Sequence, residues 1–154
     1  MSLTGRSDTE LNASIEGGDY WPTLQLADFI HQFRLPVEHK AQILTNELTV
    51  AALVVQEQLA LFRQAVPVFA DLTTPVYSTT AVLTLYQRAV FALARARLGK
   101  HFLSLGSKAS NDVQADLDDN SYDYWLGQSE QAVEQLIKAV GKKVLPAGFL
   151  VETI

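Results

Sequence analysis

The histidines are the first residues in this chain to consider for catalysis or metal binding. His31, His39 and His101 stand in three separate segments. None has a second histidine four positions away, the spacing that places two imidazoles around a zinc ion on one helix face. Catalysis requires a nucleophile, a base and an orienting group to converge, or a metal in their place. The spacing therefore favours surface or partly buried histidines over a catalytic base or a metal ligand.

Acidic residues gather in the last third of the chain, at Asp116, Asp118, Asp119 and Asp123. A calcium loop arranges its oxygen ligands around a glycine at a fixed position, and this segment has no glycine there. Acids near the N-terminus of a helix are stabilised by the helix macrodipole. We therefore interpret this cluster as the start of a helix and not as a calcium site.

A phosphate-binding loop is not expected either. Gly17 and Gly18 precede an aromatic pair and not a helix that opens with Lys and Ser or Thr. The chain contains no cysteine, which excludes disulfides and thiolate metal sites. The sequence thus predicts no catalytic residue, no metal and no cofactor, and a protein that is not an enzyme.

Composition indicates one domain with little bulk attraction for nucleic acid or membranes. The 154 residues include 12 Lys and Arg against 17 Asp and Glu, a net charge of −5. This balance gives no electrostatic reason to expect a nucleic-acid or membrane partner. The longest apolar run, residues 50–55, is too short to span a bilayer, and the polar N-terminal segment does not resemble a signal peptide.

Charge is nevertheless distributed unevenly along the chain. No acid occurs between Asp71 and Asp112, whereas this interval holds Arg88, Arg95, Arg97, Lys100, His101 and Lys108. The segment that follows is acidic. Three interpretations remain open: pairing between adjacent helices of one fold, a head-to-tail contact between subunits whose opposite charges lie on opposite flanks, or contact of the basic face with a DNA backbone.

The elements that would position these residues are helices. Residues 1–20 are polar and aperiodic and predict a flexible arm. Thr23 is predicted to cap a short helix that should end before Pro36, because proline disfavours helical geometry in the preceding residue. The apolar positions of this helix are Leu26, Phe29, Ile30 and Phe33.

A single long helix is predicted over residues 37–66. Its main apolar face is Val37, Ala41, Leu44, Leu48, Ala51, Val55, Leu59, Phe62 and Val66. A second apolar set is Ile43, Val50, Val54 and Leu61. A helix that is apolar on two faces must be covered twice, either within its own bundle or by another chain.

Two further helices follow. One should begin at Ser78 or Thr79, with faces marked by Val82, Tyr86, Ala89, Leu93 and Ala96, and by Phe91, Leu98, Phe102 and Leu105. Its alanine-rich run, residues 88–98, allows close approach of a neighbouring helix. After a polar loop at residues 106–111, the last helix should start between Asp112 and Asn120 and end near Gly141. Its predicted buried stripe is Tyr122, Trp125, Ala132, Leu136 and Val140, with Val133 and Ile137 beside it.

The predicted fold is therefore an all-α, single-domain bundle of about four helices, two of them long. A flexible N-terminal arm (residues 1–20) precedes the bundle domain (residues 21–143), and an extended C-terminal tail (residues 144–154) follows it.

Several short stretches, in order along the chain, carry a family resemblance. They are Trp21-Pro22, Phe33-Arg34-Leu35, Asn46-Glu47-Leu48, residues 86–90 (Tyr-Gln-Arg-Ala-Val), residues 94–98 (Ala-Arg-Ala-Arg-Leu) and residues 151–154 (Val-Glu-Thr-Ile). Over about residues 20–154 the chain resembles the head completion, or head stabilisation, proteins of contractile-tailed bacteriophages, which are often encoded by prophages. It departs from them after the third helix, where they carry an Asp- and Thr-rich segment, and in its last helix, which is more basic in the family.

The resemblance implies a non-enzymatic protein that completes assembly of the capsid. Such a protein binds the portal vertex after DNA packaging, stabilises the filled head and prepares head–tail joining. The implied partners are the portal protein, neighbouring copies, a tail-completion protein and, weakly, packaged DNA, with no membrane and no small-molecule substrate. The implied location is the host bacterial cytoplasm during assembly and then the virion.

The residues expected to make these contacts are Arg88, Arg95, Arg97 and Lys100 on the basic face, and Phe149, Val151 and Ile154 in the tail. The alternative function is a small cytoplasmic helical adaptor or regulatory protein that acts as a dimer.

Overall fold

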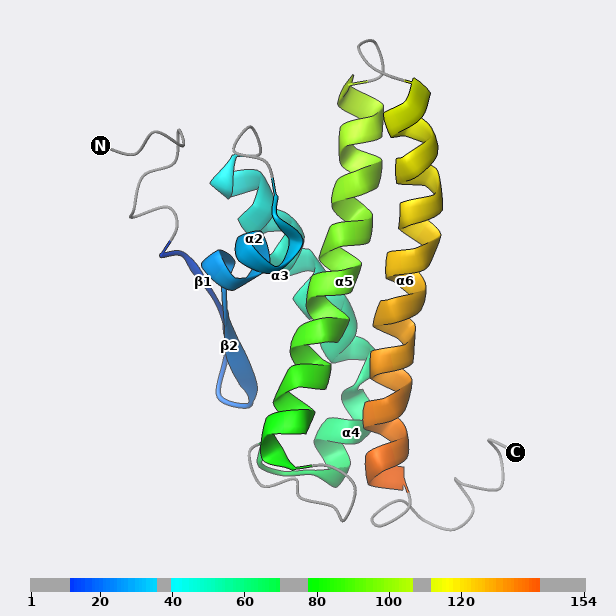
Figure 1. Ribbon diagram of the computed structural model, residues 1–154. Helices are drawn as coiled ribbons and strands as arrows, with labels where there is room; N and C mark the ends of the chain where they lie inside the picture. The colour runs from blue at the N-terminus through cyan, green and yellow to red at the C-terminus, as the bar shows by residue number, and fades with distance from the viewer. Residues whose placement is uncertain (1–11, 36–39, 70–77, 107–111, 142–154) are drawn as a thin grey trace.

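The computed structural model describes residues 12–35, 40–69, 78–106 and 112–141, with side chains described outside residues 101–120 and 141. Within these ranges the chain is mostly helical (Figure 1). The elements are β1 (Ser14–Gly17), β2 (Trp21–Gln25), α2 (Leu26–Phe33), α3 (Ala41–Gln58), α4 (Ala60–Ala65), α5 (Thr79–Gly106) and α6 (Asp112–Gly141). The predicted helical bundle with two long helices is confirmed.

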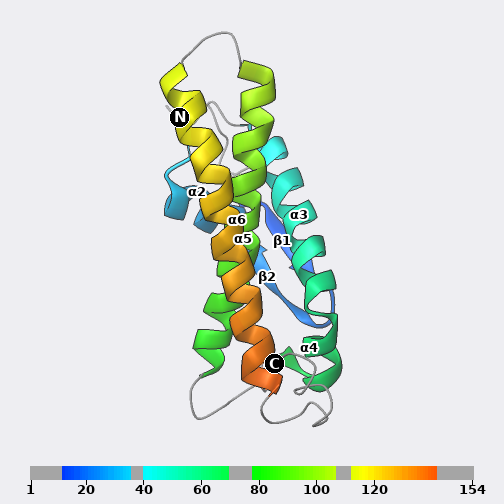
Figure 2. The same ribbon diagram turned by 90° about the vertical axis from the view of Figure 1, so that its right-hand side faces the viewer.

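The two long helices, α5 and α6, run antiparallel and side by side over their length (Figures 1 and 2). Small side chains of α5 at Ala89, Ala92 and Ala96 are buried, which allows the two backbones to approach closely. At this junction the buried hydroxyl of Ser129 in α6 donates a 2.7 Å hydrogen bond to the carbonyl oxygen of Ala89. α5 starts at Thr79, as predicted, and the Ser78 hydroxyl accepts a 3.2 Å hydrogen bond from the Ala81 amide.

The buried stripe predicted for the last helix is confirmed in its C-terminal half. Ala132, Val133, Leu136 and Val140 are buried. Tyr122 and Trp125 are only partly buried. The side chains of Phe102 and Leu105 lie outside the described residues.

The helix predicted over residues 37–66 is in fact two helices. α3 ends at Gln58, Leu59 has φ −97° and ψ 19°, and α4 starts at Ala60. The main face is nevertheless buried as predicted, at Ala41, Leu44, Leu48, Ala51, Val55, Leu59, Phe62 and Val66. Val37 lies outside the described residues. Beyond this break, the buried Phe62 of α4 packs against the Trp21 ring of β2 and the Phe69 ring that follows α4.

The second apolar set of this region is covered incompletely. Ile43 and Val54 pack partly buried against the core. Val50 is 37 % exposed, Leu61 is 41 % exposed, and Leu53 beside them is 61 % exposed. The fold itself therefore leaves part of this face uncovered.

The N-terminal segment contains a β-hairpin where a flexible arm was predicted. β1 pairs antiparallel with β2 in the register Ser14↔Gln25, Ile15↔Leu24 and Gly17↔Trp21. Ile15, Trp21 and Leu24 are buried, so that burial of one hairpin face stabilises it. Residues 1–11 of the predicted arm and residues 144–154 of the predicted tail lie outside the described residues.

Glycines permit the tight geometry of this hairpin. The ladder is irregular between Ile15 and Gly17. A Cβ added at Gly17 would collide with the backbone carbonyl and Cβ of Trp21. Gly18 has φ +68°, in the left-handed region that glycine adopts at little cost.

The short helix α2 starts later than predicted. Thr23 lies in β2 and does not cap it, and the N-cap residue, Gln25, makes no side-chain capping bond. Instead, the Leu26 amide donates a 3.0 Å hydrogen bond to the Ala13 carbonyl oxygen, which joins the helix start to the hairpin. The predicted stop before Pro36 is confirmed, because α2 ends at Phe33 and Arg34 takes a left-handed conformation with φ 49°.

An aromatic cluster joins the hairpin to α4 and α5. The Trp21 ring stacks on the Tyr86 ring, with centroids 5.2 Å apart, and lies 6.3 Å from the Phe62 ring. Phe69 packs against all three rings. Burial raises the pKa of Tyr86 above its ordinary value, although the hydrogen bond from the Gln56 amide to its hydroxyl oxygen acts in the opposite direction.

Candidate protein-interaction site

The four cations predicted to form one basic face of α5 are divided by the structure. Arg88 and Arg95 are seven positions apart and therefore lie on the same side of the helix. Arg97 is two positions beyond Arg95, a rotation of about 200° around the helix axis. The four cations therefore lie on more than one face of α5.

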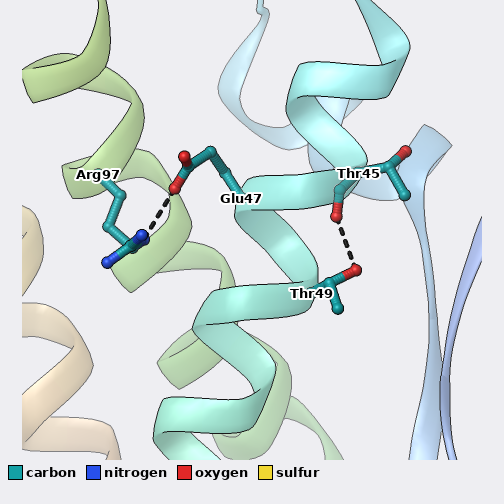
Figure 3. Close-up of polar contacts among 4 residues, drawn as sticks. All are labelled: Thr45, Glu47, Thr49 and Arg97. Atoms are coloured by element: carbon teal, nitrogen blue, oxygen red, sulfur yellow. Dashed lines mark hydrogen bonds and ion pairs between the residues drawn. The ribbon is translucent and has the colours of Figure 1, made fainter.

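Arg97 is paired within the fold. Its Nε donates a 2.7 Å hydrogen bond to Oε2 of Glu47 in α3, and the two side chains are 39 % and 18 % exposed (Figure 3). On the same stretch of α3, the Thr49 hydroxyl donates a 2.8 Å hydrogen bond to the Thr45 carbonyl oxygen. The carboxylate that pairs with Arg97 thus comes from α3 and not from the acidic helix α6.

Contacts of Arg88 and Lys100 with α6 use uncharged partners. Nη2 of Arg88 donates a 2.6 Å hydrogen bond to Oε1 of Gln128. Nζ of Lys100 lies 4.1 Å from the centroid of the Tyr122 ring, within cation–π distance. These contacts link adjacent helices, as the first interpretation of the charge pattern expected, but without carboxylates.

A surface pocket of about 450 Å³ lies between α2, α5 and α6. We call it the arginine pocket; its lining residues are Gln32, Phe33, Arg34, Thr84, Gln87, Arg88, Phe91, Ala92, Arg95 and Trp125. The Phe33 and Trp125 rings form a T-shaped pair, with centroids 4.9 Å apart and planes at 74°. The volume of the arginine pocket falls in the range of ordinary ligand pockets.

The arginine pocket combines positive charge with apolar surface. Arg34, Arg88 and Arg95 contribute three guanidinium groups, and the lining residues include no carboxylate. Each guanidinium has five N–H donors in a planar fork that matches a carboxylate. The rings of Phe33, Phe91 and Trp125 form an apolar wall. The pocket is therefore suited to a protein segment that presents carboxylates.

Sequence reasoning identified only two of these three arginines. Arg34 directly follows α2, some fifty positions before Arg88, and only tertiary packing brings the two together. Trp125 was assigned to a buried stripe, but it is partly exposed and lines the pocket. The residues around Trp125 in the sequence of α6 are polar and gave no indication that its side chain lines a pocket.

A second candidate surface is apolar. Val50 and Leu53 lie three positions apart in α3, Leu61 lies in α4, and all three side chains are exposed. Figure 2 shows α3 and α4 along one edge of the molecule and α2, whose C-terminal end lines the arginine pocket, on the other side of α6. We call these three residues the α3–α4 apolar face. Exposed apolar patches mark contacts with other proteins, and these three residues are the candidate for such a patch.

Other kinds of site find no support in the described part of the chain. No group of three or more His, Cys, Asp or Glu side chains there could hold a metal ion. No described helix is long and apolar enough to cross a membrane. The predicted tail contacts Phe149, Val151 and Ile154 lie outside the described residues.

Comparison with known proteins agrees with a role in assembly. Comparison with curated proteins and with solved structures found no match. The family model described as "Phage head completion protein (GPL)" matches residues 15–144, which include every described helix from α2 to α6. This is a family of non-enzymatic structural proteins of the phage head, so the prediction that the chain is not an enzyme is confirmed. Because the match covers most of its length, the chain belongs to the phage head completion protein family.

Proposed function

We propose that this protein binds the portal vertex after DNA has been packaged, stabilises the filled capsid and prepares it for head–tail joining. The observation that carries the proposal is the family match over residues 15–144. In this proposal the chain acts in the host bacterial cytoplasm during assembly and then remains at the portal vertex of the virion. Its partners are the portal protein and neighbouring copies of itself.

The exposed surfaces support a role based on protein contacts. The fold of the chain itself leaves the α3–α4 apolar face open, with Leu53 the most exposed residue at 61 %. Burial of apolar surface is the main favourable contribution to most protein–protein association. We assign this face to the portal contact.

Co-sedimentation with portal rings from the same genome tests the proposal. We expect saturable binding of the full chain near the stoichiometry of the portal itself. Leu53→Asp/Leu61→Asp should abolish binding, because two charges would be buried in the contact without partners. Leu83→Asp is the matched control, since Leu83 is an exposed leucine of α5 (41 %) outside this face.

Two outcomes would contradict the proposal. If the full chain at micromolar concentration does not sediment with portal rings and forms a stable dimer by light scattering, the dimeric adaptor becomes the better explanation. If the double variant Leu53→Asp/Leu61→Asp binds as well as the wild type and as the Leu83→Asp control, the portal contact lies elsewhere and the assignment of the α3–α4 apolar face is wrong.

A further inference from the structure

The arginine pocket has room for an anionic segment in addition to its internal contacts. Arg88 already binds Gln128, and Arg95 also has a partner within the chain. Each guanidinium nevertheless carries five N–H donors, more than one acceptor can use. Carboxylate partners would add charge-assisted hydrogen bonds, which are the stronger kind.

A complementary surface lies on α6 of the same chain. Its described acids Asp123, Glu130 and Glu134 follow steps of seven and four, which keeps them on one side of the helix. We call them the acidic stripe. Asp123 and Glu130 are exposed. Glu134 is exposed too, but it is paired with Lys138 at 2.9 Å. The carboxylates that we consider for a contact with another molecule are therefore those of Asp123 and Glu130.

The two carboxylates of the acidic stripe and two guanidinium groups of the arginine pocket have the same spacing along their helices. Asp123 and Glu130 are seven positions apart on α6, and Arg88 and Arg95 are seven positions apart on α5. Seven residues of α-helix rise by about 10 Å. A helix laid alongside α5 can therefore bring both carboxylates to both guanidinium groups at once.

Gly127 lies at the centre of the acidic stripe, between Asp123 and Glu130. A Cβ at this position would meet no atom within 4 Å, so the fold of the chain itself gives no reason for a glycine. Glycine in a helix interior is less stable than alanine. The missing side chain leaves a gap between the two carboxylates at which another molecule can approach closely.

The acidic stripe and the arginine pocket lie on different flanks of the molecule. Asp123 and Trp125 are two positions apart, a rotation of about 200° around the axis of α6. Figure 2 shows α6 in front, with α2 on one side and α3 on the other. Since Trp125 lines the pocket beside α2, the stripe points away from it. Two such surfaces form a head-to-tail contact between copies and not a two-fold one.

We propose that the acidic stripe of one copy docks into the arginine pocket of the next, with Asp123 and Glu130 paired to Arg88 and Arg95. This inference rests on the proposed assembly function, which requires contacts between neighbouring copies. A second copy suits the pocket better than duplex DNA does. The chain carries a net charge of −5, and three arginines in a hollow do not form the extended basic ridge that tracks a DNA backbone.

The test uses the purified full chain alone, without portal, so that its result is independent of the proposed portal contact. Sedimentation velocity should show concentration-dependent association at low salt that weakens as salt screens the charge pairs. Arg88→Glu/Arg95→Glu should remove the association, and so should Gly127→Trp, which fills the gap in the stripe without altering charge. Lys40→Glu/Arg63→Glu, an equal charge change at exposed residues outside the pocket, should associate as the wild type does.

Mixing the two defective variants distinguishes this contact from any other. The arginine variant keeps an intact stripe and Gly127→Trp keeps an intact pocket, so one working interface remains per pair. The mixture should form a one-to-one heterodimer and nothing larger. Circular dichroism of each variant should match that of the wild type, because neither change enters the core.

Three results would overturn the inference. One is a wild type that stays monomeric at low salt and high concentration. Another is undiminished association of the arginine variant or of Gly127→Trp. The third is loss of duplex DNA binding in the arginine variant with no change in self-association. Portal co-sedimentation that persists under any of these results would leave the proposed function standing.

Discussion

The aromatic cluster at the β-hairpin and the interface between α5 and α6 achieve close packing with opposite kinds of side chain. In the cluster, large rings from four segments meet face to face or edge to face, with Trp21 stacked on Tyr86 at 5.2 Å. In the helix pair, buried alanines such as Ala89 and Ala96 bring two backbones together along a regular interface. The cluster depends on a few large side chains, whereas the helix pair depends on many small ones.

This contrast indicates where single substitutions should act most strongly. Removing a ring leaves a cavity that its neighbours fill only in part, whereas enlarging an alanine separates two rigid helices. Four predictions test the comparison, in order of decreasing effect.

Trp21→Ala should lower the free energy of unfolding by about 3 to 5 kcal/mol, the usual cost of deleting a buried tryptophan side chain. Trp21 is 6 % exposed and touches Phe62, Phe69 and Tyr86. Urea unfolding followed by circular dichroism measures the change. Trp125→Ala is the control and should cost clearly less, because Trp125 is only partly buried. Equal losses would mean that the aromatic cluster has no special weight.

Ala89→Leu should lower the free energy of unfolding by about 1 to 3 kcal/mol, because added methyl groups would force α5 and α6 apart. Ala89 is fully buried, and its carbonyl oxygen accepts the hydrogen bond from Ser129. The same urea experiment applies. Leu83→Ala, at an exposed position of α5, should change stability by less than about 0.5 kcal/mol. An Ala89→Leu variant as stable as the wild type would show that the interface is loosely packed.

Gly17→Ala should destabilise the hairpin by about 1 to 2 kcal/mol, because the new Cβ would collide with Trp21. The effect should appear as a lower midpoint of thermal unfolding. Gly127→Ala provides the opposite case, since its Cβ would enter open space and a helix-interior alanine is favoured by about 1 kcal/mol. The two alanine substitutions should therefore shift the midpoint in opposite directions, and a shift of the same sign would refute this account.

The free energy of unfolding should fall at alkaline pH through the tyrosines at the aromatic cluster, and these groups should cause no pH dependence near neutrality. Burial raises the pKa of Tyr20 to about 12, although Arg63 acts in the opposite direction. Burial also raises the pKa of Tyr86. The unfolded chain loses these protons near pH 10 while the folded chain retains them, so the unfolding free energy should fall as pH rises above 10.

Tyr20→Phe should make this alkaline loss smaller. The substitution also removes the hydrogen bond that the Tyr20 hydroxyl donates to the Val66 carbonyl oxygen, so it should lower stability slightly at neutral pH. Urea midpoints at several values between pH 8 and pH 11 measure both effects. An alkaline slope unchanged by Tyr20→Phe would show that Tyr20 does not contribute to it.

Apolar periodicity predicted the helices well and the hairpin not at all. The apolar positions of α3 and the alanine-rich face of α5 recur at steps of three and four, and these residues are buried. Pro36 correctly marked the end of α2. The hairpin gave no comparable signal, because β1 is four residues long, carries one buried apolar side chain and begins in a polar segment. A strand this short becomes stable only through the Trp21 cluster, which is a long-range contact.

The sequence alone predicted most of the helical segments, their apolar faces and the regions where positive and negative charge concentrate, although it merged α3 and α4 into one helix. The family match places the chain among the phage head completion proteins. Local spacing and composition suffice for the helices and the charge distribution, whereas the family match depends on the order of residues over most of the chain. Tertiary structure decided how the cations are used: it paired Arg97 with Glu47 across fifty positions and brought Arg34 beside Arg88 and Arg95 in one pocket. On a helix, cations seven positions apart face the same neighbouring element, whereas cations two positions apart face opposite ones. Which elements these neighbours are depends on tertiary packing, because they come from distant parts of the chain.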